Sequence, residues 1–200
     1  MKNLIPILFL IINCGYGQEY TNENGVFHYR DVVEVDKTQK EIRSIASKWV
    51  AINFVDSKEV SRLDTDETII VKALFYVRRI NVGIEKRMDF TMDLAFKDGR
   101  YKIEFYGLPD IWNHIGLKLP IQDPDQYTVE DFKNNCILAA NISGMKKMIQ
   151  MKIEKEEWVS KHYKKSKDDM EDSYKQVKNK IDAIAQSLKN TIVSSKKSDW

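Results

Sequence analysis

The fold follows from residues 88–105, MDFTMDLAFKDGRYKIEF. Large apolar side chains occupy alternate positions on both sides of Asp98-Gly99, a dipeptide that favours a two-residue type I′ turn. A shift of one residue would turn every apolar side chain to the other face, so the pattern predicts one register. The turn pairs the large apolar residues of the two strands: Phe96 with Tyr101, Leu94 with Ile103, and Met92 with Phe105.

A strand and a helix are predicted upstream of this hairpin. Residues 26–35 alternate apolar and polar side chains, with Asp31 as the exception, and indicate a strand. Thr38 and Glu41 have the spacing of a capping box, in which each side chain accepts a hydrogen bond from the other residue's amide. The apolar residues that follow recur every three or four positions and predict a helix with Trp49 in the core: Ile42, Ile45, Ala46, Trp49, Val50 and Phe54.

Two more strands are predicted between this helix and the hairpin. Residues 58–63 indicate a short strand, and residues 68–79 are rich in β-branched and aromatic side chains. The resulting order is β-α-β-β-β-β, an antiparallel sheet whose apolar face is covered by the helix stripe. The predicted fold class is therefore α+β.

These elements resemble a known family. The hairpin residues 97–101 (KDGRY), the helix residues 48–50 (KWV) and the element order are similar to domain of unknown function 4468, found mainly in exported proteins of Bacteroidota. The resemblance covers residues 26–108, and the final Asp199-Trp200 resembles the ending of some longer members. It implies a TBP-like β-α-β-β-β-β-α unit. It implies no catalytic residue or cofactor, and a TBP-like fold does not by itself imply DNA binding.

The second half begins with residues 107–127, which are predicted to be irregular. Thr128 then opens a helix, which is expected to be the second helix that closes the TBP-like unit. Cys136 lies on or near its apolar face, so it is expected to be a small buried hydrophobe rather than a reactive thiol.

A C-terminal helical extension is predicted over residues 151–200, after a domain over 18–150 with its core at 26–108. Such a helix needs a partner surface, either its own domain, a second copy or another protein. From residue 146 the chain holds 14 lysines and 9 acidic residues, about +5, which fits a solvated face or weak membrane-surface contact. A heptad-like seam runs along the last helix: Met170, Tyr174, Val177, Ile181, Ile184 and Leu188.

The first residues predict export. Residues 1–17 combine Lys2, a short apolar run and a small-residue cleavage site, which is typical of a signal peptide. The mature chain is then periplasmic or secreted and has no transmembrane segment, because the apolar run is too short to span a bilayer. The alternative is a lipid anchor through Cys14.

Composition and motifs exclude several classes of function. A net charge of +2 argues against a nucleic-acid-binding protein. The histidines, His28, His114 and His162, lack the spacing of zinc ligands, so no metal, catalytic residue or cofactor is assigned. The hairpin register places Asp93 opposite Glu104 on the polar face, with Lys102 nearby, and these three are the candidate ligand-binding residues.

The sequence therefore favours an exported binding or envelope-associated module without catalytic activity, with a protein partner or self-association through its last helix. The alternative is a small enzyme with a site on the polar sheet face or in a cleft between sheet and tail, lined by Asp93, Glu104 or His114.

Overall fold

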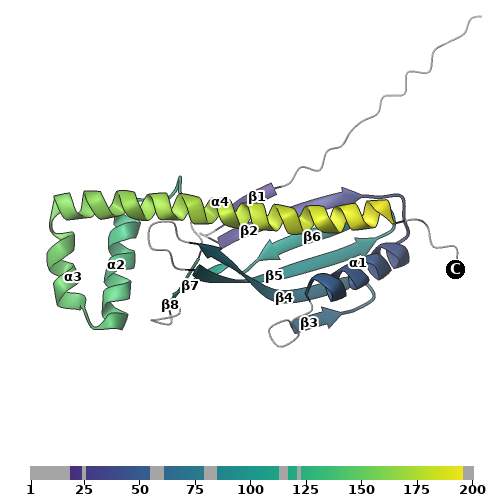
Figure 1. Ribbon diagram of the computed structural model, residues 1–200, viewed down its shortest axis with the longest axis horizontal. Helices are drawn as coiled ribbons and strands as arrows, with labels where there is room; N and C mark the ends of the chain where they lie inside the picture. Colours follow the sequence, from purple (N-terminus) through teal and green to yellow (C-terminus); the bar gives the residue numbers. More distant parts are fainter. Residues whose placement is uncertain are drawn as a thin grey trace, which may run out of the picture.

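The structure is a computed structural model that describes residues 19–23, 26–54, 61–78, 85–112, 117–120 and 123–195. The expected signal peptide, Cys14 and His114 lie outside these ranges. Within them the chain forms one antiparallel sheet, two helices on its apolar face, and a pair of helices at one end (Figure 1). This arrangement confirms the predicted α+β class.

Six strands form the sheet, in the spatial order β1-β2-β6-β5-β4-β3, and every neighbouring pair is antiparallel. Two short strands extend it, because β7 pairs with β5 and β8 pairs with β7. The bounds are β1 Glu19–Glu23, β2 Val26–Glu34, β3 Ser61–Asp64, β4 Thr68–Arg78, β5 Glu85–Lys97, β6 Arg100–Tyr106, β7 Pro109–Trp112 and β8 Leu117–Pro120.

The β5–β6 hairpin has the predicted register. Lys97 lies opposite Arg100, and all three predicted apolar pairs face each other. Gly99 has a φ of 78°, a left-handed conformation that glycine adopts without steric cost. The turn also contacts the start of α1, because the Asp98 side chain accepts a hydrogen bond from the main-chain amide of Gln39 at 2.7 Å.

The described ranges contain four helices: α1 Gln39–Asn53, α2 Val129–Ser143, α3 Lys146–Ile153 and α4 Glu156–Ser194. Both capping boxes are present, Thr38 with Glu41 at α1 and Thr128 with Asp131 at α2. In α1, Trp49 is buried as predicted, and its indole N–H donates to Ser187 Oγ of α4 at 3.1 Å.

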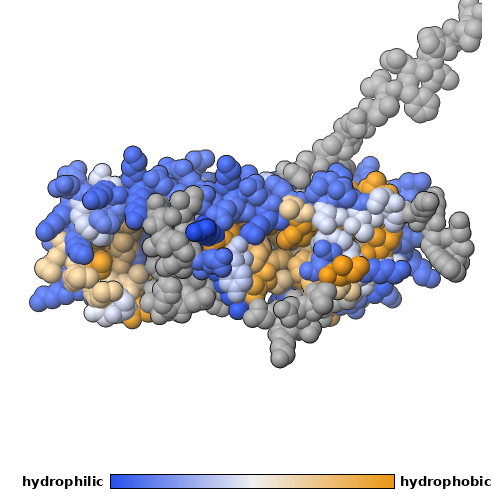
Figure 2. Space-filling model, viewed as in Figure 1, coloured by the Kyte–Doolittle hydropathy of each residue, from blue (hydrophilic) through white to orange (hydrophobic). Residues whose placement is uncertain are grey.

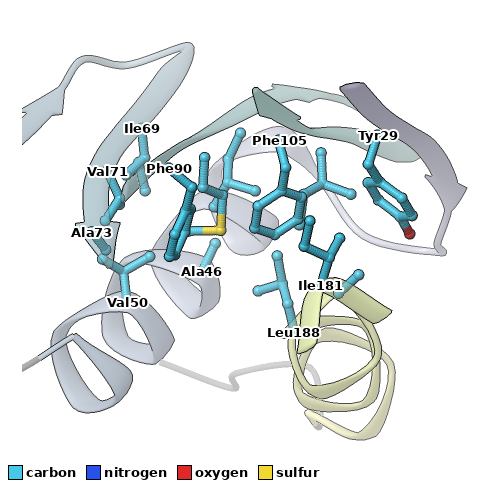
Figure 3. Packing of buried hydrophobic residues seen from close by; sticks show 14 of the residues in the cluster. Tyr29, Ala46, Val50, Ile69, Val71, Ala73, Phe90, Phe105, Ile181 and Leu188 are labelled. Carbon is cyan, nitrogen blue, oxygen red and sulfur yellow. The ribbon is translucent and has the colours of Figure 1, made fainter. Parts of the chain in front are cut away.

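The second helix on the sheet is α4 and not α2, contrary to the sequence-based prediction. The C-terminal half of α4 lies beside α1 against the apolar face of the sheet (Figures 1 and 3). It contributes five residues to the same core as the sheet: Val177, Ile181, Ala185, Leu188 and Ile192. The residues predicted as a separate extension, 151–200, thus supply part of the core of the domain predicted for 18–150.

The reason lies in the apolar stripe that each helix offers. Phe132 and Ala140 are the only buried residues of α2, whereas α4 presents an apolar stripe about four turns long. The longer stripe removes more apolar surface from water and therefore competes better for the sheet. The heptad-like seam predicted from the sequence includes Ile184, whereas the structure buries Ala185 at this point of the helix. Such a shift is expected for a straight helix that does not supercoil around a partner.

Polar bonds hold α4 on both sides of this stripe. The Tyr20 hydroxyl of β1 donates to Asp182, and Lys37 Nζ donates to the Ser195 carbonyl at 2.6 Å. Near the other edge of the sheet, Gln176 bonds to the main chain of Arg78 through its amide oxygen at 2.9 Å and its amide nitrogen at 2.7 Å. The last helix is therefore integrated into the sheet domain.

The core is one apolar layer between the sheet and the two helices. Ala46 and Val50 of α1 and Ile181 and Leu188 of α4 point towards the sheet residues (Figure 3). Ring contacts join neighbouring strands, such as Tyr29 to Phe105 with centroids 5.7 Å apart. Trp49 and the hairpin aromatics meet in this layer, so the predicted packing of helix on hairpin is confirmed.

A second, smaller core holds α2 and α3 against the N-terminal half of α4. Its buried residues are Tyr127, Phe132 and Val159, with Cys136, Ile153, Trp158, Tyr163 and Met170 packed around them. Tyr163 donates its hydroxyl to the Tyr127 carbonyl at 2.8 Å, and the two rings stack 5.7 Å apart. The helix α4, about 58 Å long at 1.5 Å per residue, thus connects two separate apolar clusters.

Candidate functional site

The candidate residues Asp93, Glu104 and Lys102 lie on the polar face of the sheet. The structure brings them together in the predicted register, with Asp93 opposite Glu104 on the adjacent strands β5 and β6. Helices α1 and α4 cover the other face. The proposed location in a cleft between sheet and tail is therefore wrong for Asp93 and Glu104, because the tail packs on the opposite side.

Basic side chains surround Glu104. Lys102 Nζ lies 2.5 Å from its Oε2, Arg30 Nε lies 3.7 Å from its Oε1, and His28 Nε2 lies 3.9 Å from that same oxygen. Arg30 and His28 come from β2, which pairs with β6. The carboxylate of Glu104 is thus neutralised within the sheet surface, as expected for cross-strand charge pairing.

Asp93 has a different environment. Burial raises the pKa of its carboxyl group, Glu104 raises it further, and Lys102 acts in the opposite direction. Its Oδ1 is buried and has no hydrogen-bond partner among the described residues. A carboxyl group in such a position is protonated more readily than an exposed one. The Asp93 carboxyl group therefore has unusual acid–base properties.

The described residues offer little for metal or nucleophile chemistry. No group of three or more His, Cys, Asp or Glu side chains in the described ranges is arranged to hold a metal ion. Burial raises the pKa of Cys136, which disfavours the thiolate needed for nucleophilic attack. His162 stacks on Trp158, which packs against the second core, with ring centroids 4.2 Å apart, and a ring nitrogen of His162 lies 2.7 Å from the Trp158 carbonyl oxygen.

A second candidate site lies on the helical hairpin formed by α2 and α3. Of the 11 large hydrophobic residues exposed in the described chain, 6 lie on this hairpin or its turn. Figure 2 shows apolar side chains gathered over this end of the molecule. We call the five nearest the turn the hairpin patch: Leu138, Ile142, Met145, Met148 and Met151.

The hairpin patch occupies an outward face. On α3, Met148 and Met151 are one turn apart and exposed, whereas Ile153 packs into the second core. The turn between the helices is closed by Gly144, whose φ is 73°, and by a hydrogen bond from the Met145 amide to the Ala140 carbonyl. A defined turn therefore presents the exposed methionines on a folded support.

Lysines accompany the hairpin patch. Helix α3 begins with Lys146 and Lys147, both exposed, and has no acidic residue in its first turn. Helices α1 and α2 both begin with acidic residues and capping boxes, which suit the positive end of a helix dipole. The start of α3 departs from this rule, and such departures in folded proteins concentrate at functional surfaces.

The sequence-based reasoning did not single out the hairpin patch. The available signal was the spacing of Met145, Met148 and Met151, three residues apart and interleaved with lysines. That spacing alone fits a buried stripe equally well, and only the placement of α4 decides that these side chains remain exposed.

Comparisons with known proteins find two similar solved structures. No family model and no curated protein matches the chain. It is similar to the crystal structure of a TBP-like protein from Parabacteroides distasonis ATCC 8503, with 18% identity and a TM-score of 0.47, over 84% of this chain and 96% of that one. It is also similar to a DUF4468 family protein from Bacteroides ovatus ATCC 8483, with 13% identity and a TM-score of 0.42, over 50% of this chain and 63% of that one. These similarities match the resemblance drawn from the hairpin and helix motifs.

Among the described residues, no helix has the length and apolar character needed to cross a membrane.

Proposed function

We propose that this protein is an exported, envelope-associated binding module without catalytic activity, and that the hairpin patch is its contact surface. One observation carries the proposal: most of the large hydrophobic side chains exposed in the described chain gather on the α2–α3 hairpin. Clustered exposed apolar side chains mark interaction surfaces, whereas scattered ones are ordinary.

Methionine suits this role. Its side chain is flexible and polarisable, so it adapts to partners of different shape. Three of the five side chains in the hairpin patch are methionines. The helix α4 supports the hairpin from a large, well-packed core, so the contact surface is presented away from the sheet (Figure 1).

Site-specific photo-crosslinking in the native host tests the proposal. A photoreactive amino acid at Met148 is expected to give a defined adduct with an envelope component. The same amino acid at Ile52, which is 73% exposed on α1, is the matched control and is expected to give none. No adduct at Met148, or the same adducts at both positions, would contradict the proposal.

A second candidate function is a small-molecule or enzymatic site around Asp93, Glu104 and Lys102 on the polar sheet face. The observation that favours it is the buried, unpaired Oδ1 of Asp93 together with the raised pKa of that carboxyl group. Thermal-shift screening of the wild type and of an Asp93→Asn, Glu104→Gln variant tests it. Ligands that stabilise only the wild type would support a site, whereas a change in stability without lost ligands would indicate a structural role.

A further inference from the structure

We propose that the hairpin patch and its lysines dock on the surface of an anionic lipid bilayer. The inference rests on the proposed function, because it names the partner of that same contact surface. The patch combines exposed apolar side chains with exposed cations, and a bilayer with anionic headgroups offers a complementary surface for both.

The charge at the turn of the hairpin is positive: residues 138–151, which include the whole patch, hold Lys146 and Lys147 and no acidic residue, whereas Glu156 and Glu157 lie further on, at the start of α4. Residues 144–155 hold four lysines and one acidic residue: Lys146, Lys147, Lys152, Lys155 and Glu154. Two of these lysines occupy the first turn of α3, where the helix dipole already places positive charge. An anionic surface would relieve this repulsion, whereas an apolar surface without charge would not.

The position of the patch suits a flat partner. The α2–α3 hairpin lies at one end of the molecule, beside the N-terminal half of α4 and away from the sheet (Figure 1). Met148 and Met151, at a spacing of three residues, share one side of α3, and Leu138 and Ile142, at a spacing of four, share one side of α2. Side chains of this kind can enter the headgroup region while the lysine ammonium groups stay at the phosphate level.

A second copy of the chain fits this surface less well. A symmetric dimer built on the patch would bring the lysines of both hairpins into one interface, because a two-fold interface uses the same surface of both copies. The like charges would then repel each other at the moment of apolar contact. A bilayer with negative headgroups avoids this conflict.

Vesicle co-sedimentation of the chain from Gln18 to Trp200, which contains every described residue, tests the inference. We expect binding to vesicles of phosphatidylethanolamine with phosphatidylglycerol, weaker binding at higher salt, and little binding to phosphatidylcholine alone. Met148→Ser with Met151→Ser should weaken binding about tenfold, and Lys146→Gln with Lys147→Gln by a similar factor. The control variant Ile52→Ser with Val193→Ser changes side chains elsewhere that are more exposed than the two methionines, and it should bind like the wild type.

Several results would overturn the inference: no binding by the wild type, equal binding to both kinds of vesicle, or unchanged binding by the methionine and lysine variants. Circular dichroism of each variant confirms that it is folded. Dimerisation in light scattering that the methionine variant abolishes, without vesicle binding, would assign the patch to a second copy instead. A protein adduct from Met148 in the crosslinking experiment, without vesicle binding, would reject the lipid partner and leave the proposed binding function in place.

Discussion

The two halves of helix α4 differ in what they hold together. The C-terminal half buries five residues in a 25-residue core that it shares with the sheet and α1. The N-terminal half meets a core of three buried residues, shared with α2 and α3, and both counts refer to the residues that the structure describes. One continuous helix therefore joins a strongly packed end to a weakly packed one.

The two ends of the molecule have different roles: the sheet end stabilises the fold, and the hairpin end offers a contact surface. Burial of apolar surface dominates folding free energy, so the sheet end determines whether the chain folds. The hairpin end buries little and exposes the hairpin patch, which is the expected arrangement for a binding surface on a rigid support. Substitutions at the sheet end should therefore change the stability of the whole chain. Substitutions at the hairpin end should change only the local stability of the hairpin.

The largest effect is expected for Leu188→Ala. Leu188 is fully buried between α4 and the sheet, so the cavity and lost transfer free energy should lower the free energy of unfolding by about 4 kcal/mol. Urea denaturation followed by circular dichroism measures it. Val193→Ala, at an exposed position of the same helix, is the control, and an equal loss for both would place α4 off the sheet.

Phe132→Ala should act locally. The Phe132 ring contacts Trp158 and Tyr163 in the second core, with centroid distances of 6.1 and 6.2 Å. Its removal should make opening of the hairpin easier by about 3 kcal/mol. Hydrogen exchange should accelerate over residues 129–153, while amides of β5 and β6 keep their protection. Acceleration over the whole chain would mean that the two cores unfold together.

The two capping boxes allow the same chemical change at each end. Thr38→Ala and Thr128→Ala each remove one side-chain acceptor from a helix start, a loss of about 1 kcal/mol. The first should lower the global unfolding midpoint, because α1 covers the sheet. The second should raise exchange in α2 alone. A global loss from Thr128→Ala would contradict the division of the chain into two ends.

The smallest effects concern three carboxyl groups with shifted pKa values and carry opposite signs. Burial raises the pKa of Asp31 and of Asp93 above the usual 3.8, so each contributes stability below that pH and loses it as the pH rises through the native pKa. Asp131 has a lowered pKa because Thr128 donates to it, so its contribution is present above pH 3.8 and disappears as the pH falls through the native pKa.

Unfolding curves across the acidic range test these signs. Asp31→Asn and Asp93→Asn should each be more stable relative to wild type at neutral pH than below pH 3.8. Asp131→Asn should show the reverse, seen as hydrogen exchange in α2. Lys189 of α4 attracts the Asp31 carboxylate, so Lys189→Gln should strengthen the Asp31 effect. A wild-type profile unchanged by all three substitutions would contradict the assignment.

Local patterns were sufficient to predict much of the sheet domain. The Asp98-Gly99 turn and the alternation around it fixed a register that the structure reproduces, including the facing pair Asp93 and Glu104. The capping box at Thr38 likewise marked the start of α1. These features depend on residues close in sequence, where turn chemistry and side-chain spacing decide the conformation.

Strands with a weak local pattern, and contacts between strands distant in sequence, were missed. β1 contains one large apolar residue, Tyr20, and becomes a strand by pairing with β2. β7 and β8 lie in a stretch predicted to be irregular, and Pro109 and Pro120 weaken the strand signal there. The pairing of β2 with β6 brings Arg30 and His28 to Glu104, and no local pattern indicated that neighbour.

Asp31 shows how a broken pattern can be informative. The sequence identified it as the polar exception on an apolar strand face, and the structure buries it there, facing the region of Lys189. The choice of α4 over α2 as the second sheet helix was also not predictable from periodicity, because both helices are amphipathic. It depends on which apolar stripe buries more surface against the sheet, and the sheet is formed by other segments of the chain.

Native-state hydrogen exchange along α4 tests the central claim most directly. The account predicts that amides from Val177 to Ile192 open with the same free energy as those of β5 and β6, and that amides before Met170, with those of α2 and α3, open more easily. Uniform protection along α4, or weaker protection at its C-terminal half than at the hairpin, would contradict it.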